Sequence, residues 1–256
     1  MTDTAISSLT GAQRGGLKDV NARERRFFLV FSLITAAMIV VGFLPSFYLK
    51  DVIHAPPPLQ AMTRVHGAIF TAWMALFVTQ AALIDRGSTA LHRRLGLMGA
   101  VLLGLVLAVG MMTAINAGRL GHMPPGVGPS ALTFMAVPAS GIVATGLLFL
   151  AAFWNRAARD VHMRYMLAGF ISMTPPGTHR AIMGMMGFPN QALFASFALM
   201  NGLLLVAALY DFRLRGRIHR TYLWSALVYA ATDGFIVWAY ASPATWLAMA
   251  HWLIQT

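Results

Sequence analysis

The sequence is dominated by long apolar runs, each close to the roughly 20 residues that a helix needs to cross the hydrocarbon core of a bilayer. Backbone polar groups must be satisfied internally in hydrocarbon, which limits such segments to helices or closed barrels. The runs occupy residues 27–49, 65–84, 95–115, 132–154, 163–187, 194–210 and 222–240. We therefore predict an all-α polytopic membrane helical bundle of seven transmembrane helices, with residues 27–243 as one domain.

The two ends of the chain differ from these runs. Residues 1–26 are polar and basic, and we expect a disordered cytoplasmic tail. The first apolar run is too long for a signal-peptide core, which predicts an uncleaved anchor helix. Residues 244–256 are too short to span a membrane alone, and their Trp246 and Trp252 favour a position at the membrane interface.

The positive charges are distributed unevenly along the chain. Fifteen of the 19 lysines and arginines lie in the tail and in the loops after the second, fourth and sixth runs, while the alternate loops hold four. This bias predicts a cytoplasmic N-terminus and an external C-terminus. It also accounts for the net charge of +11, which suits anionic lipid. A nucleic-acid partner is therefore not needed to explain the basic character of the chain.

The fifth run combines an apolar composition with costly polar groups. Ionisable side chains at membrane depth usually face a bundle interior or an aqueous cavity. A proline break at this depth leaves backbone groups that need partners in neighbouring helices. The stretch from Asp160 to Asn190, which contains this run, carries His162, Arg164, Pro175-Pro176-Gly177, His179 and Arg180. This segment is the first candidate for a functional site.

Four histidines fall at two depths in the predicted bundle. His66 and His179 lie toward the outer side, because His179 is roughly 25 Å along the fifth run from its cytoplasmic start. His92 and His162 lie toward the cytoplasmic side. Two histidines on each side match the axial ligation of two haems, through which electrons could cross the membrane. The alternative is that these histidines are polar interface residues with hydrogen-bond partners.

Small residues and aromatics form regular patterns on several predicted helices. His66, Phe70, Trp73, Phe77 and Gln80 lie along one face of the second helix, a pattern more typical of packing than of a cofactor wall. Small residues that recur every four positions let helices approach closely in lipid. Such seams, which we interpret as structural, are Ala100, Gly104 and Ala108 in the third run and Ala136, Ser140 and Ala144 in the fourth.

Asp233 is the one acidic residue inside a predicted span. A carboxylate at this depth needs a partner or a proton. Arg180 lies at a similar depth, which predicts an intramembrane Arg180–Asp233 ion pair that either fixes helix packing or gates a polar path. A zinc site formed by His66, His179 and Asp233 is a further alternative, because three such ligands with an open position are typical of catalytic zinc.

Several phrases of the sequence resemble a family of bacterial multi-pass predicted membrane proteins of unknown function. The phrases are His66-Gly67-Ala68-Ile69-Phe70-Thr71-Ala72-Trp73, then Leu76-Phe77-x-x-Gln80, Leu91-His92-Arg93-Arg94-Leu95-Gly96 and His162-Met163-Arg164-Tyr165-Met166. The resemblance implies a bacterial inner membrane and supplies no activity. The placement of the histidines is also similar to that of transmembrane two-haem b-type cytochromes, which implies haem b and a redox partner or quinone.

Other classes of function are excluded by missing residues. Lys18 and Lys50 are the chain's lysines and neither lies inside a predicted helix, so no retinal Schiff base can form in the core. The chain has no cysteine and no phosphate-binding, zinc-protease or hydrolase-elbow motif. Three hypotheses remain: a haem b electron carrier, a zinc-dependent membrane hydrolase, and a cofactor-free carrier or channel.

Overall fold

The computed structural model describes residues 11–53, 58–124, 127–187 and 189–255. Within these ranges the chain is helical and forms no strand. In chain order the elements are α2 (Gly11–Phe43), the short π-helix η1 (Leu44–Tyr48), α3 (Ala61–Asp85), α4 (Thr89–Arg119), α5 (Ala131–Phe134), α6 (Ala136–Trp154), α7 (Arg159–Ile171), α8 (Pro175–Met186), α9 (Pro189–Arg215), α10 (Arg220–Ala241) and α11 (Pro243–Gln255). The all-α prediction is thus confirmed.

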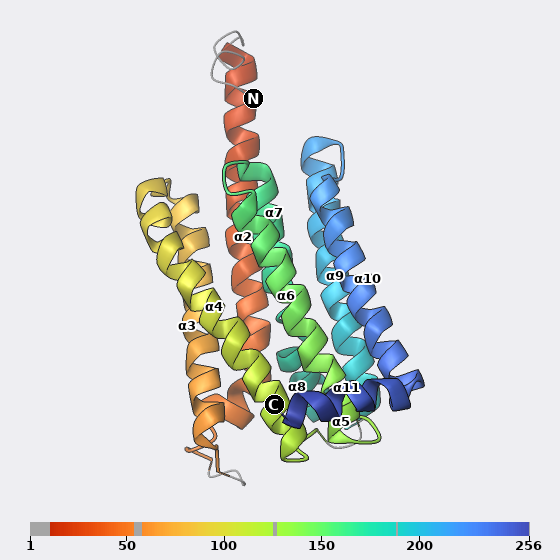
Figure 1. Cartoon of the computed structure of the whole chain (residues 1–256). Coiled ribbons are helices and arrows are strands. Elements are labelled where there is room, and N and C mark those ends of the chain that lie inside the picture. Colours follow the sequence, from red (N-terminus) through yellow and green to blue (C-terminus); the bar gives the residue numbers. More distant parts are fainter. Residues whose placement is uncertain (1–10, 54–57, 125–126, 188, 256) are drawn as a thin grey trace.

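The basic loops gather at one end of the bundle. Figure 1 shows the connections α3–α4, α6–α7 and α9–α10 at the same end as the first half of α2, while α5, α8 and α11 lie toward the other end. We call the end that holds these three connections the arginine-rich end. It is defined by Arg86, Arg93, Arg94, Arg156, Arg159, Arg213, Arg215 and Arg217. This grouping agrees with the alternation of charged loops, and the orientation relative to the cytoplasm stays a prediction.

Among the residues that the structure describes, five helical segments are long and apolar enough to cross a membrane: Asp19–Tyr48, Ala61–Asp85, Thr89–Arg119, Ala131–Trp154 and Gln191–Arg215. The chain therefore has the features of an integral, multi-pass membrane protein. The α7–α8 pair and α10 are not among these five. The break shortens both α7 and α8, and Asp233 with its polar neighbours lowers the hydropathy of α10. The count of seven spans stays a prediction.

The first long helix extends further toward the N-terminus than expected. From Gly11 onward the predicted tail is part of α2 and is helical rather than disordered. No proline occurs in this stretch before Pro45, so nothing in the backbone forces an end to the helix. Contacts of Glu24 with α7 and α9, described below, also hold this part of α2 against the bundle.

The Pro-Pro-Gly sequence divides the predicted fifth span into two helices. α7 ends at Ile171, and α8 begins at Pro175, where the missing N–H costs no hydrogen bond. Gly177 allows α8 to approach the backbone of α2. A Cβ on Gly42 would lie 1.8 Å from the Gly177 carbonyl oxygen, and a Cβ on Gly177 would lie 2.9 Å from the Ile39 Cα. The break therefore redirects the chain so that α8 packs directly on α2.

The core around α3 is rich in aromatic rings. Trp73 and Phe77 on α3 are buried against Phe149 on α6 and Phe170 on α7. The Phe77 and Phe170 rings stack with centres 4.1 Å apart, and Trp73 meets Phe149 edge-on at 5.2 Å. The sequence interpretation of this face as packing is correct for these two residues of α3.

The last helix lies across the end of the bundle opposite the arginine-rich end (Figure 1). Its Trp246 indole N–H donates to the Leu132 carbonyl at 2.7 Å, and Arg119 Nε donates to the Ile254 carbonyl at 2.7 Å. α11 is thus fixed to α4 and to the start of α5. A helix that lies across the bundle in this way is compatible with the predicted interfacial position.

Candidate functional site

The cytoplasmic pair of histidines predicted from the sequence is brought together in the structure. His92 on α4 and His162 on α7 have ring centres 6.4 Å apart and ring planes at 79°. Helix α7 places His162 by its own N-terminal turns, and the Ala152 carbonyl at the end of α6 fixes the ring through a 2.8 Å hydrogen bond to Nδ1. The two helices thus present a pair of imidazoles to each other at the arginine-rich end.

The hydrogen bond of His162 determines which nitrogen carries its proton. A carbonyl oxygen can only accept, so Nδ1 must be the donor. In the neutral ring Nε2 then keeps its lone pair, which is the form that binds a metal. His92 is held differently: Gln80 donates from Nε2 to the His92 backbone carbonyl at 3.2 Å, while the buried His92 Nδ1 has no partner.

The outer pair is less closely defined. His66 lies on α3 and His179 on α8, and the charge of Arg180 acts on both rings. Within the described ranges no hydrogen bond or ring contact joins the two histidines; His66 packs on Phe70 with ring centres 4.2 Å apart. His179 is buried, and neither of its ring nitrogens has a hydrogen-bond partner. An unpartnered polar group in a buried position calls for an explanation such as a missing ligand.

The aromatic core of α3 separates the two pairs of histidines. His66 and Gln80 are at opposite ends of the same helix face, and Trp73 and Phe77 lie between them. The Trp73 indole N–H is buried without a partner. The histidine pairs therefore lie at the two ends of a dry, aromatic stretch of the bundle.

The predicted Arg180–Asp233 ion pair is not formed in the structure. Arg180 donates to the Pro176 carbonyl of its own helix at 2.7 Å and lies over the Phe43 ring, 4.6 Å from its centre. Asp233 on α10 instead accepts a 3.1 Å hydrogen bond from the Asn201 side chain on α9. The two side chains contact different helices.

The predicted zinc ligands are likewise not gathered. In the part of the chain that the structure describes, no group of three or more His, Cys, Asp or Glu side chains is arranged to hold a metal ion. Asp233 accepts its hydrogen bond from Asn201 on α9. The structure therefore does not group His66, His179 and Asp233 as ligands of one zinc ion.

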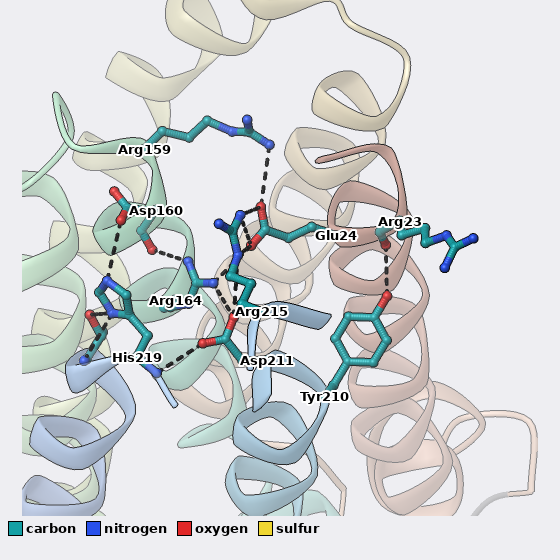
Figure 2. A network of polar contacts seen from close by, with 10 residues as sticks. Arg23, Glu24, Arg159, Asp160, Arg164, Tyr210, Asp211, Arg215 and His219 are labelled. Atoms are coloured by element: carbon teal, nitrogen blue, oxygen red, sulfur yellow. Dashed lines mark hydrogen bonds and ion pairs between the residues drawn. The ribbon is translucent and has the colours of Figure 1, made fainter. Parts of the chain in front are cut away.

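A second polar site, not predicted from the sequence, lies at the arginine-rich end. Figure 2 shows Arg164 of α7 between two carboxylates, Glu24 of α2 and Asp211 of α9. Arg164 is 0% exposed, Glu24 2% and Asp211 4%. The Arg164 guanidinium donates to Glu24 at 2.9 Å, to Asp211, and to the Asp160 carbonyl at 2.8 Å. A buried charge of this kind is stable only when paired and hydrogen-bonded.

A second arginine completes the pairing of the two acids. Arg215 on α9 donates to both oxygens of Glu24, at 2.8 and 2.9 Å, and its Nε lies 3.8 Å from Asp211. Arg159 approaches Glu24 from the surface at 3.8 Å. The excess of cation over anion is offset nearby by the Asp160 carboxylate, so the network is close to charge-balanced (Figure 2).

His219 connects this network to the start of α10. Its backbone N–H donates to Asp211 at 3.0 Å, and its Nδ1 accepts from the Thr221 backbone N–H at 3.2 Å, which caps the helix. Nε2 then carries the ring proton and faces the Asp160 carboxylate at 3.4 Å. Burial lowers the pKa of His219, and the charge of Arg164 acts in the same direction, against the nearby carboxylates. The neutral ring is therefore the form the site favours.

The network joins α2, α7, α9 and the start of α10 at one end of the bundle. Its polar groups satisfy one another, except for the Arg164 Nε, and this indicates a structural tie. The sequence contained one usable signal: acids are scarce, with eight Asp and Glu in total, yet Glu24 and Asp211 occur among the arginines of the charged segments.

No protein-family model, curated protein or solved structure matches this chain. The resemblance to bacterial membrane proteins of unknown function, and the looser one to two-haem cytochromes, therefore stay predictions. The geometry of the histidines is the basis for a functional conclusion.

Proposed function

We propose that this chain is a b-type haem protein of the bacterial inner membrane that carries electrons across the bilayer. His92 and His162 would hold one haem at the arginine-rich end, and His66 and His179 would hold a second. The observation that carries the proposal is the close approach of the His92 and His162 rings, whose centres lie 6.4 Å apart.

The separation of these rings suits a shared metal. An imidazole nitrogen binds a metal at about 2 Å, so two rings on opposite sides of one ion have centres roughly 6 Å apart. The observed 6.4 Å is close to that value. An edge-to-face pair of free rings has a similar separation, so the spectrum described below must distinguish the two cases.

The surroundings of His162 add support. A metal-bound histidine usually donates its other ring N–H to a carbonyl or carboxylate, which fixes the ring and its tautomer. The His162 Nδ1–H donates to the Ala152 carbonyl in this way and leaves Nε2 to the ligand. The unpartnered nitrogens of His92 and His179 are further candidates for ligation.

A bound haem b supplies an iron that takes up and releases one electron at a time. The histidines of the chain would hold this group, and the surrounding side chains would bury it. The buried cluster of Trp73, Phe77, Phe149 and Phe170 provides an apolar environment between the two pairs. A redox partner or a membrane quinone would exchange electrons with the protein at the two faces.

An absorption spectrum of the detergent-purified protein from haem-replete cells, before and after dithionite reduction, tests the proposal. We expect a Soret band with sharp bands in the reduced state and two haems per chain. His162→Ala or His92→Ala should remove one of the two, as should His66→Ala or His179→Ala.

His122→Ala provides the matched control, because His122 is exposed in the loop after α4 and belongs to neither pair. Its haem content should equal that of the unchanged protein. A colourless protein, or equal haem content in the His162→Ala and His122→Ala variants, would contradict the proposal.

A further inference from the structure

A cleft of about 510 Å³ opens between α2 and α9 at the arginine-rich end. It is separate from both histidine pairs and from the proposed haem function. Its walls combine exposed cations with apolar side chains, a combination that suits an amphiphilic ligand. The residues that line it are Ala22, Arg23, Arg26, Phe27, Val30 and Tyr210.

Two contacts position the aromatic side chains of the cleft. The Phe27 and Tyr210 rings stack with centres 3.7 Å apart and planes at 5°. The Tyr210 hydroxyl donates to the Arg23 carbonyl at 3.2 Å and fixes the ring at the entrance. One turn further along α2, Val30 is 43% exposed and continues the apolar surface toward the membrane interior. Tyrosine at this level is typical of the interface between headgroups and hydrocarbon.

The cations of the cleft are only partly neutralised. The Arg23 side chain has no hydrogen bond or ion pair in the described part of the chain, and Figure 2 shows it directed away from the buried network. Arg26 makes one contact, a 3.3 Å ion pair with Asp85, while its side chain stays 70% exposed. Glu24, the acid between them in sequence, is turned inward to Arg164. Positive charge is thus left over at the cleft.

We infer that this cleft binds an anionic phospholipid, with the headgroup phosphate between Arg23 and Arg26 and an acyl chain along Phe27 and Val30. Arginine pairs well with phosphate through several N–H donors, and basic pockets between membrane helices at the cytoplasmic side bind anionic headgroups. The apolar wall gives a reason to choose lipid as the occupant, since a free phosphate gains nothing from it. The bound lipid bridges α2 and α9 next to the ionic network.

Delipidated protein in detergent, titrated with phosphatidylglycerol or with phosphatidylcholine of the same acyl chains, tests this inference by native mass spectrometry and thermal unfolding. Phosphatidylglycerol should stay bound and raise the unfolding temperature more than phosphatidylcholine does. The double variant Arg23→Gln with Arg26→Gln should bind phosphatidylglycerol roughly 30-fold more weakly, since the two arginines contribute about equally to the binding free energy of the anionic headgroup. Arg23→Lys with Arg26→Lys should retain most of the binding.

The matched control is Arg93→Gln with Arg94→Gln, which removes the same charge from exposed positions at the start of α4. This variant should bind the anionic lipid as the unchanged protein does. Equal effects of the two lipids, or equal losses in the two glutamine variants, would overturn the inference. Stabilisation by inorganic phosphate alone to the same extent would also overturn it, because the site would then recognise an anion without its lipid.

Discussion

Arg164 illustrates what a charged residue needs in order to remain inside a helical bundle. It is fully buried, yet it has a carboxylate on each of two neighbouring helices and a backbone carbonyl on its own. Removing water from an unpaired charge costs several kcal/mol. The three acceptors of Arg164 offset this desolvation cost in combination. The partners Glu24 and Arg164 are separated by 140 positions. No local pattern predicts such a contact, and this explains why the sequence did not reveal it.

Replacement of Arg164 by methionine should destabilise the protein by about 3–5 kcal/mol, because Glu24 and Asp211 would remain buried with only Arg215 and the more distant Arg159 to pair them. Thermal or denaturant unfolding in detergent measures this loss. Arg26→Met is the control: its ion pair with Asp85 is exposed, and pairs of this kind contribute about 0–1 kcal/mol. A loss for Arg164→Met no larger than for Arg26→Met would show that the network does not hold the helices together.

Asp233 shows that the depth of a residue along its helix does not by itself predict which side chain it contacts. Rise along a helix placed Arg180 and Asp233 at the same level, but it does not fix the direction in which each side chain points. In the structure Asp233 faces Asn201 on α9, while Arg180 lies over Phe43 at the end of α2. The His92–His162 pair was predicted by the same kind of argument and did meet. The depth of a residue limits which side chains it can contact, and the packing of the helices decides which of these contacts forms.

At the scale of helices, apolar length predicted the elements well, and sequence spacing alone predicted their packing less well. The Pro-Pro-Gly sequence ended α7 as expected. The small-residue seam of α4 did not pack as expected: Ala100, Gly104 and Ala108 line an open apolar groove beside α6, and a Cβ on Gly104 would meet nothing within 4 Å. A close backbone approach lies instead between α2 and α8, at Gly42 and Gly177, which no repeated spacing indicated.

Gly42→Ala should therefore separate α2 from α8. The added methyl group would lie 1.8 Å from the Gly177 carbonyl oxygen, and backbone cannot move aside as a side chain does. We expect destabilisation of about 1–3 kcal/mol or more, measured by thermal unfolding in detergent. Gly184→Ala is the matched control, since it lies in α8 with open space around it and alanine favours a helix. That variant should be as stable as the unchanged protein or slightly more so, and an equal loss in both would contradict the close α2–α8 contact.

At the scale of the whole molecule, the alternation of basic and non-basic loops predicts both an orientation and a number of crossings. The arrangement of helices brings the basic loops to one end, but in the described part of the chain five segments rather than seven have the length and hydropathy of a span. The difference lies in α7, α8 and α10, whose polar side chains are used inside the bundle, as Arg164 is in α7 and Asp233 in α10. High hydropathy is needed where a helix contacts lipid. A helix enclosed by other helices can therefore cross a membrane with a lower hydropathy.

The absence of cysteine from the chain permits a direct test of this topology. Ser88→Cys places a thiol in the α3–α4 loop at the arginine-rich end, and His122→Cys places one after α4 at the other end. A membrane-impermeant maleimide should label His122→Cys in intact cells, and Ser88→Cys only after the cells are permeabilised, because arginine-rich loops stay in the cytoplasm. Gln191→Cys, exposed at the start of α9, and Gln255→Cys, at the end of α11, then test the two remaining crossings. If the α7–α8 pair crosses, Gln191→Cys is labelled in intact cells like His122→Cys, and if α10 also crosses, Gln255→Cys is labelled in the same way. Labelling of either variant only after permeabilisation, as for Ser88→Cys, would contradict the seven-span prediction.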